Sequence, residues 1–294
     1  MMRLDSFLSF HKRFVVEDDL VGPMKAYFRI AGYTEEEIWK FLCLYATCYS
    51  IPTSILFMNC GDIRSFCQEN KSRLIFQSDR RWMRIGDRFV RGFASVHNPQ
   101  LFKFLHNQKV VDIRTSIDRI RECAFFGRFS AYLLLEAFMG AFGKDGFFSG
   151  EFDFWEGDTA TSGLLNVMGR DSDADAFDAG ALRVLDADSM KKTLDTILSR
   201  LQGAGNCSIA FVETSLCAYR KLFKGSRYLG YYTDRCLQEL NYTKKAFPGF
   251  SRQLSLFTDA RLSTLPVKCL GELGGWDGVR KDREKRFLSG KGFY

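Results

Sequence analysis

The sequence predicts an all-α protein: a compact multi-helix domain with an irregular acidic loop in its middle. Two observations predict this class. Apolar residues recur at spacings of three and four in successive segments, which is the period of a helix buried on one face. Aromatic residues make up 15% of the chain and Pro occurs only 5 times, which argues against disorder and for a densely packed interior. The 294 residues suffice for one large domain, which we expect to have two lobes, about 1–145 and 146–294.

Helices are predicted throughout the first half of the chain. The run over 34–50 begins with Thr34 and has Glu37 three residues later, which is the spacing of a capping box. Pro52 is expected to end this helix. Over 112–142 one or two helices are predicted, with Gly127 at a kink or junction.

The middle of the chain is acidic and is expected to be irregular. Residues 151–188 carry ten acids against two arginines, and we interpret them as a solvated loop with helix-capping aspartates. The run DSDADAFDAG lacks the Gly and Glu that a calcium loop needs at its sixth and twelfth positions, so no metal site is predicted. The adjacent segment over 155–169 crowds small polar residues around two glycines. We expect a loop there that offers N–H groups and hydroxyls, including those of Thr161 and Ser162, to an anion.

Two further segments of the second half are predicted to be helical. One covers 187–201, and the other covers 212–240 with a break at Gly225. On the first part of the latter, an acid, a thiol and cations share one face: Glu213, Cys217, Arg220 or Lys221, and Lys224. On its second part tyrosines alternate with positive charge: Tyr228, Tyr231 or Tyr232, and Arg235. Aromatic rings interleaved with cations are what bases and phosphates require.

Charge and composition favour an anionic partner, with nucleic acid as the leading interpretation. The formal net charge is +7 and the sequence pI is about 8.9. Arg84, Arg88 and Arg91 share one face of a predicted helix, which is either a solvated face or a stripe that tracks phosphates. No run of about 18 apolar residues indicates a membrane span, and the N-terminus fails as a secretory signal. The nine cysteines form no CxxC pair, so neither a zinc site nor a disulfide framework is expected, and a reducing cytoplasm is the natural location.

Familiar catalytic motifs are absent from the sequence. There is no GxxxxGK[ST] loop or other nucleotide-binding motif, no HExxH and no GxSxG. The chain has 3 His, and each is interpreted as a surface or core residue. An enzyme of this sequence would therefore work with carboxylates, Lys, Arg, Tyr or Cys.

Three segments together carry a family resemblance: GRFSAYLLLEAF at 127–138, WEGDTATSGLLNVMG at 155–169, and VETSLCAYRKLFKGSRYLGYYTDRCLQEL at 212–240. They resemble the bacteriophage alpha-glutamyl/putrescinyl thymine pyrophosphorylases, also called amino acid:DNA transferases. The helical domain of phage 5-hydroxymethyluracil DNA kinases is similar too, but there it accompanies a nucleotide-binding kinase domain, and this chain lacks the phosphate-binding loop. The resemblance implies an all-helical fold related to helical DNA glycosylases, and a location in the host cytoplasm.

The resemblance also implies a reaction and its partners. An amine, either an amino acid or a polyamine, would displace pyrophosphate from 5-(pyrophosphoryloxymethyl)uracil in double-stranded DNA and so make a hypermodified thymine. Whether a metal ion such as Mg²⁺ helps to bind the pyrophosphate is left open.

The chemistry of this reaction assigns candidate roles to residues. A carboxylate must deprotonate the amine and cations must meet the leaving pyrophosphate. The expected catalytic residues are Glu213, Asp158 and Lys221. The expected pyrophosphate contacts are Arg220, Lys224, Arg227, Thr161 and Ser162. The expected base or amine contacts are Arg128, Trp155, Tyr228, Tyr231, Tyr232 and Arg235, around a base that is flipped out of the duplex.

Other interpretations stay open. The charges of the 212–240 segment could form ordinary helix-surface ion pairs. The chain could be a non-catalytic helical DNA-binding partner of a 5-hydroxymethyluracil DNA kinase, or a relative of DNA glycosylases.

Overall fold

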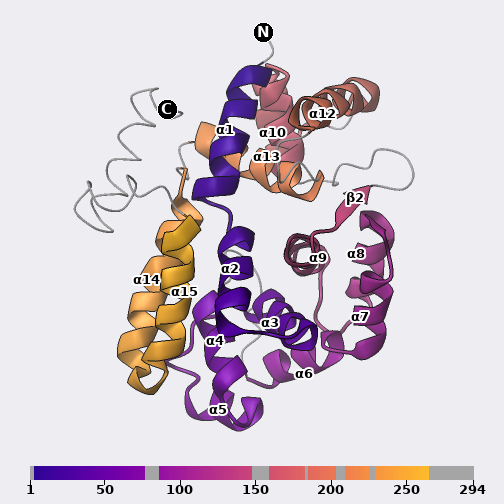
Figure 1. Cartoon of the computed structure of the whole chain (residues 1–294). Helices are drawn as coiled ribbons and strands as arrows, with labels where there is room; N and C mark the ends of the chain where they lie inside the picture. The colour runs from indigo at the N-terminus through magenta and orange to yellow at the C-terminus, as the bar shows by residue number, and fades with distance from the viewer. Residues whose placement is uncertain are drawn as a thin grey trace, which may run out of the picture. The chain divides into compact units, whose positions relative to one another are not determined.

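The computed structural model describes residues 3–76, 86–147, 159–182, 185–202, 209–224 and 229–264. Over these residues the protein is all-α, as predicted, and β structure is limited to one short parallel pair of strands (Figure 1). Tertiary contacts group the chain into two units. The α13 unit contains the described residues of 1–19 and 150–233, and the α9 unit contains those of 20–149 and 234–265. One boundary is close to the expected division at 145/146, but each unit also takes a segment from the opposite end of the chain.

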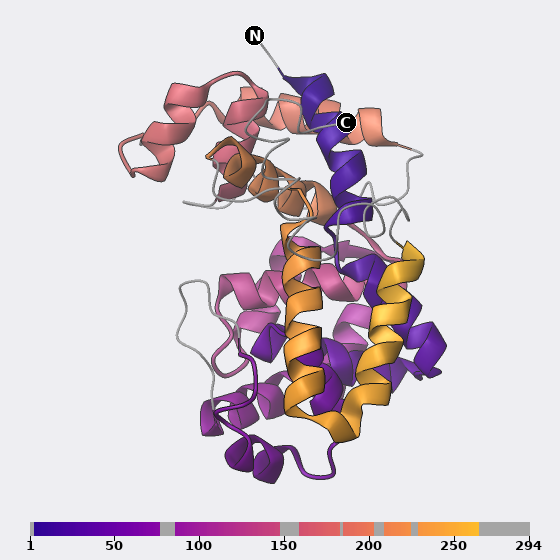
Figure 2. The ribbon, with the colours of Figure 1, turned by 90° about the vertical axis from the view of Figure 1, so that its left-hand side faces the viewer.

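The α9 unit is built mainly from the first half of the chain. In order, its elements are α2 (Val21–Ala31), α3 (Glu35–Cys48), α4 (Ile51–Asn59), α5 (Ile63–Glu69), α6 (Asp87–Val96), α7 (Pro99–His106), β1 (Val110–Asp112), α8 (Ile113–Arg121), α9 (Arg128–Phe142), β2 (Asp145–Phe147), the 3₁₀ turn η1 (Pro248–Phe250) and α15 (Ser251–Thr264). Helix α14 (Tyr231–Ala246) begins in the α13 unit and continues in this one. Figure 2 shows α14 beside α15, where Lys244 Nζ donates to Thr258 Oγ1 over 3.0 Å.

Helix ends in the α9 unit follow local sequence signals. The predicted capping box at the start of α3 is confirmed: Thr34 N donates to Glu37 Oε2 over 2.9 Å, and Glu37 N donates to Thr34 Oγ1 over 3.3 Å. The expectation that Pro52 ends this helix is wrong, because Pro52 lies in the first turn of α4, behind the cap of Ser50. Proline fits that turn because its missing N–H would have no partner there. Gly127 is the predicted junction and precedes α9 as its N-cap.

Aromatic rings fill the interior of the α9 unit. Phe57 and Phe89 stack with their centroids 4.6 Å apart, and Trp39 meets Phe138 edge to face at 6.0 Å. All four side chains are at most 3% exposed. This arrangement agrees with the packed aromatic interior that the composition predicts.

The α13 unit contains α1 (Leu4–Glu17), α10 (Thr159–Val167), α11 (Asp171–Asp178), α12 (Ala187–Leu201) and α13 (Ile209–Phe223) (Figure 1). Helices α10 and α13 approach each other closely at Gly163. A Cβ placed on Gly163 would lie 2.1 Å from the backbone oxygen of Leu216, so only glycine allows this approach. Helix α1 covers α13, and the rings of Phe7 and Phe10 lie 5.4 and 5.3 Å from that of Tyr219.

The expected irregular acidic loop is wrong over most of its described length. Residues 159–167 and 171–178 form helices α10 and α11. Asp171 and Asp173 lie in the first turn of α11, where a negative charge is favourable beside the helix N-terminus. The expected anion-binding loop is wrong as well, because Thr161 and Ser162 lie on α10 and are fully buried. Asp186 does cap α12, as expected of an aspartate in this region, by accepting from Ser189 N over 3.1 Å.

Among the described helices, none combines the length and apolar character needed to cross a membrane.

Candidate functional site

Arg220 lies at the centre of a buried polar network in the α13 unit. Its side chain is 3% exposed and is enclosed by α10, α11 and α13. Its Nη1 donates to Asn166 Oδ1 over 3.1 Å, and its Nη2 donates to Asp175 Oδ1 over 2.6 Å. Both Nε and Nη2 donate to Asp178 Oδ2, over 3.0 and 2.8 Å. The guanidinium thus joins three helices through charge-assisted hydrogen bonds.

The network reaches the surface through Asp178. In addition to Arg220, this carboxylate accepts from Ser162 Oγ and forms an ion pair with Lys224 Nζ. The Lys224 side chain is 44% exposed, against 3% for Arg220. Lys224 is therefore far more accessible to solvent and to a ligand than Arg220, and Asp178 holds its ammonium in place.

A second branch runs to the N-terminal segment. Asn166 Nδ2 donates to Asp171 Oδ1 over 2.6 Å, and Arg3 binds both oxygens of Asp171 at 2.6 and 2.7 Å. The backbone N–H of Arg3 also donates to Val167 O over 2.7 Å. We call the whole cluster the Arg220 network: Arg3, Ser162, Asn166, Asp171, Asp175, Asp178, Arg220 and Lys224.

Two acids of the Arg220 network, Asp171 and Asp178, have lowered pKa values in the folded protein. The hydrogen bond from Arg3 lowers the pKa of Asp171. Burial alone would raise the pKa of Asp178, but hydrogen bonds from Lys224, Ser162 and Arg220 outweigh it and lower the pKa. Burial would likewise lower the pKa of Arg220, but its bonds to the two aspartates raise it. Three cations thus face three carboxylates, and the network is formally neutral.

This neutrality limits what Arg220 can do. A pyrophosphate would have to displace Asp175 and Asp178 from a guanidinium that has no access to solvent. The geometry gives Arg220 a positioning role in place of the expected pyrophosphate contact, and the same holds for Ser162. Thr161 is fully buried on α10 and offers no surface hydroxyl.

Glu213 lies on the same face of α13 as Arg220, because seven residues correspond to nearly two whole turns. Lys224 follows the last residue of α13, and its N–H donates to Arg220 O over 3.1 Å. It is 6% exposed, and Thr214 Oγ1 lies within hydrogen-bond distance of Glu213 Oε2, at 3.3 Å. Eleven residues of helix separate Glu213 from Lys224 by a rise of about 16 Å. A ligand shared by both would therefore lie between them, with its two ends toward different groups. Lys221 is half-buried on the same helix.

The expected tyrosine pair begins α14 and is anchored from a distance. Asp18, at the end of α1, accepts from Tyr232 N over 2.7 Å and from Thr233 N over 3.2 Å. Asp18 thus caps α14 across more than two hundred residues of sequence, although caps are normally local. The rings of Tyr231 and Tyr232 are half-buried and meet edge to face at 5.6 Å.

Two expected base or amine contacts belong to the α9 unit. Arg235 Nε donates to Glu239 Oε1 over 3.2 Å, one turn along α14, and Ser50 Oγ donates to Glu239 Oε2 over 3.4 Å. Arg128 is the first residue of α9 and is half-buried. The remaining candidates, Asp158, Trp155, Arg227 and Tyr228, lie outside the described residues.

Sequence reasoning missed the acids that organise this site. Asp171, Asp175 and Asp178 recur at helical spacing, which could have identified them as one face of a helix. Arg3 and Asp18 carry no local signal for their roles, since their partners are far away in the sequence.

His11 is a core residue, one of the two interpretations given for each histidine. It is 2% exposed, and its Nδ1 lies 2.7 Å from Ser215 Oγ, which is fully buried. Ser215 Oγ in turn donates to Phe211 O over 2.8 Å. This pair has no access to a substrate.

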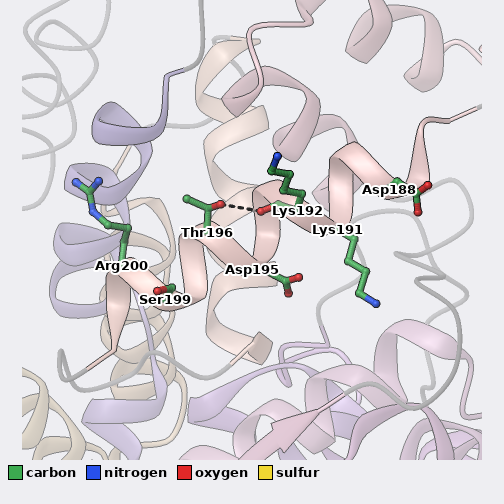
Figure 3. Close-up of a pocket in the computed structure, with 7 residues that line it drawn as sticks. All are labelled: Asp188, Lys191, Lys192, Asp195, Thr196, Ser199 and Arg200. Carbon is green, nitrogen blue, oxygen red and sulfur yellow. Dashed lines mark hydrogen bonds between the residues drawn. The ribbon is translucent and has the colours of Figure 1, made fainter.

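A surface hollow on α12 offers no alternative site. Its lining residues are Asp188, Lys191, Lys192, Asp195, Thr196, Ser199 and Arg200 (Figure 3). All of them project from one helix, acids alternate with bases, and the hydroxyl of Thr196 donates to the carbonyl of Lys192 over 2.7 Å. A binding site normally gathers groups from several elements around a concave space, which is not the case here.

Comparisons with known proteins give no match: no protein-family model and no curated protein matches this chain. The family resemblance therefore stays a prediction, and any functional assignment depends on the geometry above.

Proposed function

We propose that this protein is a DNA-modifying transferase, in which an amine displaces pyrophosphate from 5-(pyrophosphoryloxymethyl)uracil in double-stranded DNA. The observation that carries this proposal is the arrangement of one face of α13. A buried carboxylate, Glu213, lies on this helix, and an exposed ammonium that an aspartate holds in place, that of Lys224, follows its last residue.

The reaction needs a base and a cation at different places, and Glu213 and Lys224 can supply them. The amine nitrogen attacks the exocyclic methylene carbon, and the carbon–oxygen bond to pyrophosphate breaks with its electron pair going to the oxygen. Glu213 accepts the proton that the amine loses, while Lys224 meets the negative charge of the leaving group. Nucleophile and leaving group lie on opposite sides of the carbon, so a base and a cation at opposite ends of the ligand suit this displacement. Lys221, one turn before Lys224, adds positive charge near the leaving group.

The Arg220 network supplies the rigidity that such a site requires. Arg220 fixes Asp178 by two bonds, and Asp178 fixes Lys224. A cation that is already in place before the charge develops stabilises the transition state without a reorganisation cost.

The partners follow from the same chemistry. A formal charge of +7 favours a polyanion such as DNA, and the modified base would reach the site by flipping out of the duplex. Tyr231 and Tyr232 at the start of α14 are the described aromatic residues that we assign to the base. The second substrate is a small amine or amino acid.

A second candidate function is a non-catalytic DNA-binding protein. The observation that favours it is the neutrality of the Arg220 network, because a fully paired network can also serve stability alone. Glycosidic cleavage, as in DNA glycosylases, would produce abasic sites instead of pyrophosphate, so the same assay distinguishes it.

The test is a transfer assay with the full chain and DNA that carries the pyrophosphorylated base. Released pyrophosphate and the new nucleoside are measured with glutamate, glycine and putrescine as amines, the nucleoside by mass spectrometry. Glu213→Gln and Lys224→Met should each lower the rate about 100-fold, whereas the exposed control Lys191→Met should leave it unchanged. Full activity of both site variants would contradict the assigned roles.

A further inference from the structure

An exposed aromatic ring lies beside an arginine in the α9 unit, at the turn that joins α8 to α9. The side chain of Phe125 is 41% exposed. The guanidinium carbon of Arg91, on α6, lies 5.2 Å from the centroid of the Phe125 ring, within cation–π range. Arg88 precedes Arg91 by one helical turn, and Arg128 follows Phe125 by three residues. We call these four residues the Phe125 surface.

The backbone holds Phe125 in an unusual conformation. Its φ is +64°, in the left-handed region that glycine normally occupies. The turn is nevertheless fixed: Phe126 N donates to Cys123 O over 3.1 Å, and Ala124 N donates to Ser95 Oγ of α6 over 2.8 Å. Phe126 is buried, 6% exposed, while its neighbour projects outward. The left-handed backbone at Phe125 is strained, and burial of the side chain does not compensate for this strain. Strain of this kind is typical of functional sites, so we infer that the exposed ring binds a ligand.

The surface carries excess positive charge. Arg88 and Arg91 are exposed and Arg128 is half-buried. Within the described residues, none of the three forms an ion pair with an acid. The nearby acids are Asp87, which is exposed on α6, and Glu122, which is already paired with Arg119. One arginine over an aromatic ring, with a second one helical turn away on α6 and a third three residues along the chain, is complementary to a strand of phosphates that carries bases.

We propose that the Phe125 surface binds single-stranded DNA, with an unpaired base stacked on the Phe125 ring and phosphates held by Arg88, Arg91 and Arg128. A single strand is favoured over a duplex because bases in a duplex are already stacked on both faces, so only an unpaired base gains from the ring. Stacking on aromatic side chains and contact of arginines with the backbone are the two contributions that such binding uses. The inference goes beyond the proposed function and shares with it only the expectation of a DNA partner.

The experiment measures affinity of the full chain for an unmodified, fluorescein-labelled 20-nucleotide single strand by anisotropy, over a series of salt concentrations. Phe125→Ala should weaken binding about tenfold and leave the salt dependence unchanged, and Phe125→Trp should restore the affinity. Arg88→Gln and Arg91→Gln should each reduce the slope of log K against log salt by about 0.7. The matched controls are Phe147→Ala, which removes another exposed phenylalanine of the α9 unit, and Arg64→Gln, which removes an exposed arginine on α5.

Site variants that behave like these controls would overturn the proposal. An equal loss of duplex affinity in Phe125→Ala would overturn the stacking role. Circular dichroism and thermal unfolding establish that each variant is folded before its binding is compared. Because the strand is unmodified and no transfer occurs, this result is independent of whether the transferase assay succeeds.

Discussion

Arg220 lies in the last turn of α13 and Lys224 directly follows this helix, yet their exposure gives them different roles. Arg220 is enclosed and makes hydrogen bonds to Asn166, Asp175 and Asp178. Lys224 is 44% exposed and forms an ion pair with Asp178. Removing one partner of a buried charge pair leaves the others without compensation, while an exposed pair contributes little. Arg220 therefore positions its neighbours, whereas Lys224 is exposed enough to contact a ligand.

A pair of substitutions tests this separation. Arg220→Met should lower the free energy of unfolding by about 3 kcal/mol, because it leaves the amide oxygen of Asn166 without its donor and removes two of the hydrogen bonds that Asp178 accepts. Lys224→Met should change it by less than about 1 kcal/mol. Urea unfolding followed by circular dichroism measures both. Equal losses in the two variants would show that burial does not distinguish these cations.

Asp171 makes stability depend on pH. Its pKa is lowered in the folded protein by the hydrogen bond from Arg3, so its contribution is fully present above the unfolded value of about 3.9. That contribution is lost as pH falls from about 4 through the lowered pKa of the folded state. We expect Asp171→Asn to reduce the loss of stability between pH 4 and pH 2.5, measured by urea unfolding.

The exposed aspartate of α12 provides the control for this pH measurement. Asp195→Asn should keep the steep acid dependence of the unsubstituted protein. If Asp171→Asn also keeps it, the Arg3–Asp171 pair does not contribute to acid sensitivity.

The sequence predicted the helix on which Arg220 lies but not the burial of its side chain. The helical spacing placed Glu213, Arg220 and Lys224 on one face of a helix; the structure has Glu213 and Arg220 on α13, and Lys224 directly after its last residue. Burial was not predictable, because Asp175 and Asp178 lie more than forty residues from Arg220 in the sequence. Local residue spacing in the sequence does not identify partners that are so far apart along the chain.

At the scale of elements, the contact between α10 and α13 decides the geometry of the site. Gly163 lets the two helices come close enough for Ser162 and Asn166 to join the Arg220 network. Local patterns predicted α3 with its capping box, α12 over 187–201, and the junction at Gly127. They failed for α10 and α11, because small polar residues and aspartates have weak helix propensity, and tertiary packing supplies what propensity does not.

Replacing Gly163 tests the importance of this approach. In an ordinary helix Gly→Ala stabilises by roughly 0.5–1 kcal/mol. Here the new Cβ would meet the backbone oxygen of Leu216 at 2.1 Å, so Gly163→Ala should destabilise by about 2 kcal/mol or more. Thermal or urea unfolding shows whether the substitution raises or lowers the free energy of unfolding.

Gly22 serves as the control for Gly163. It lies in α2 with nothing within 4 Å of a built Cβ, so Gly22→Ala should be neutral or stabilising. Stabilisation by Gly163→Ala as well would show that the helices can separate without cost.

At the scale of the molecule, each of the two units combines segments that are not contiguous in the sequence. The segment over 1–19 belongs with 150–233, and 234–265 belongs with 20–149. Helix α1 ties its unit together, since Arg3 binds α11, His11 contacts Ser215 of α13, and Asp18 caps α14. The all-α class follows from composition and periodicity, but this exchange of segments could not be predicted, because each tie joins residues about 170 to 215 apart.

The two candidate surfaces also belong to different units. Lys224 and Glu213 lie in the α13 unit, where we propose the transfer reaction, and the Phe125 surface lies in the α9 unit. A net charge of +7 and an arginine-flanked aromatic ring suit the same class of partner, DNA. We therefore predict that substitutions at either surface leave the function proposed for the other unchanged.

The transferase assignment is tested most directly by measuring pyrophosphate released from DNA that contains 5-(pyrophosphoryloxymethyl)uracil, with the full chain in excess over the modified base. We predict that release requires an added amine and that one aminated nucleoside forms for each pyrophosphate. Absence of release with every amine tested, from a folded protein that binds the DNA, would contradict the account.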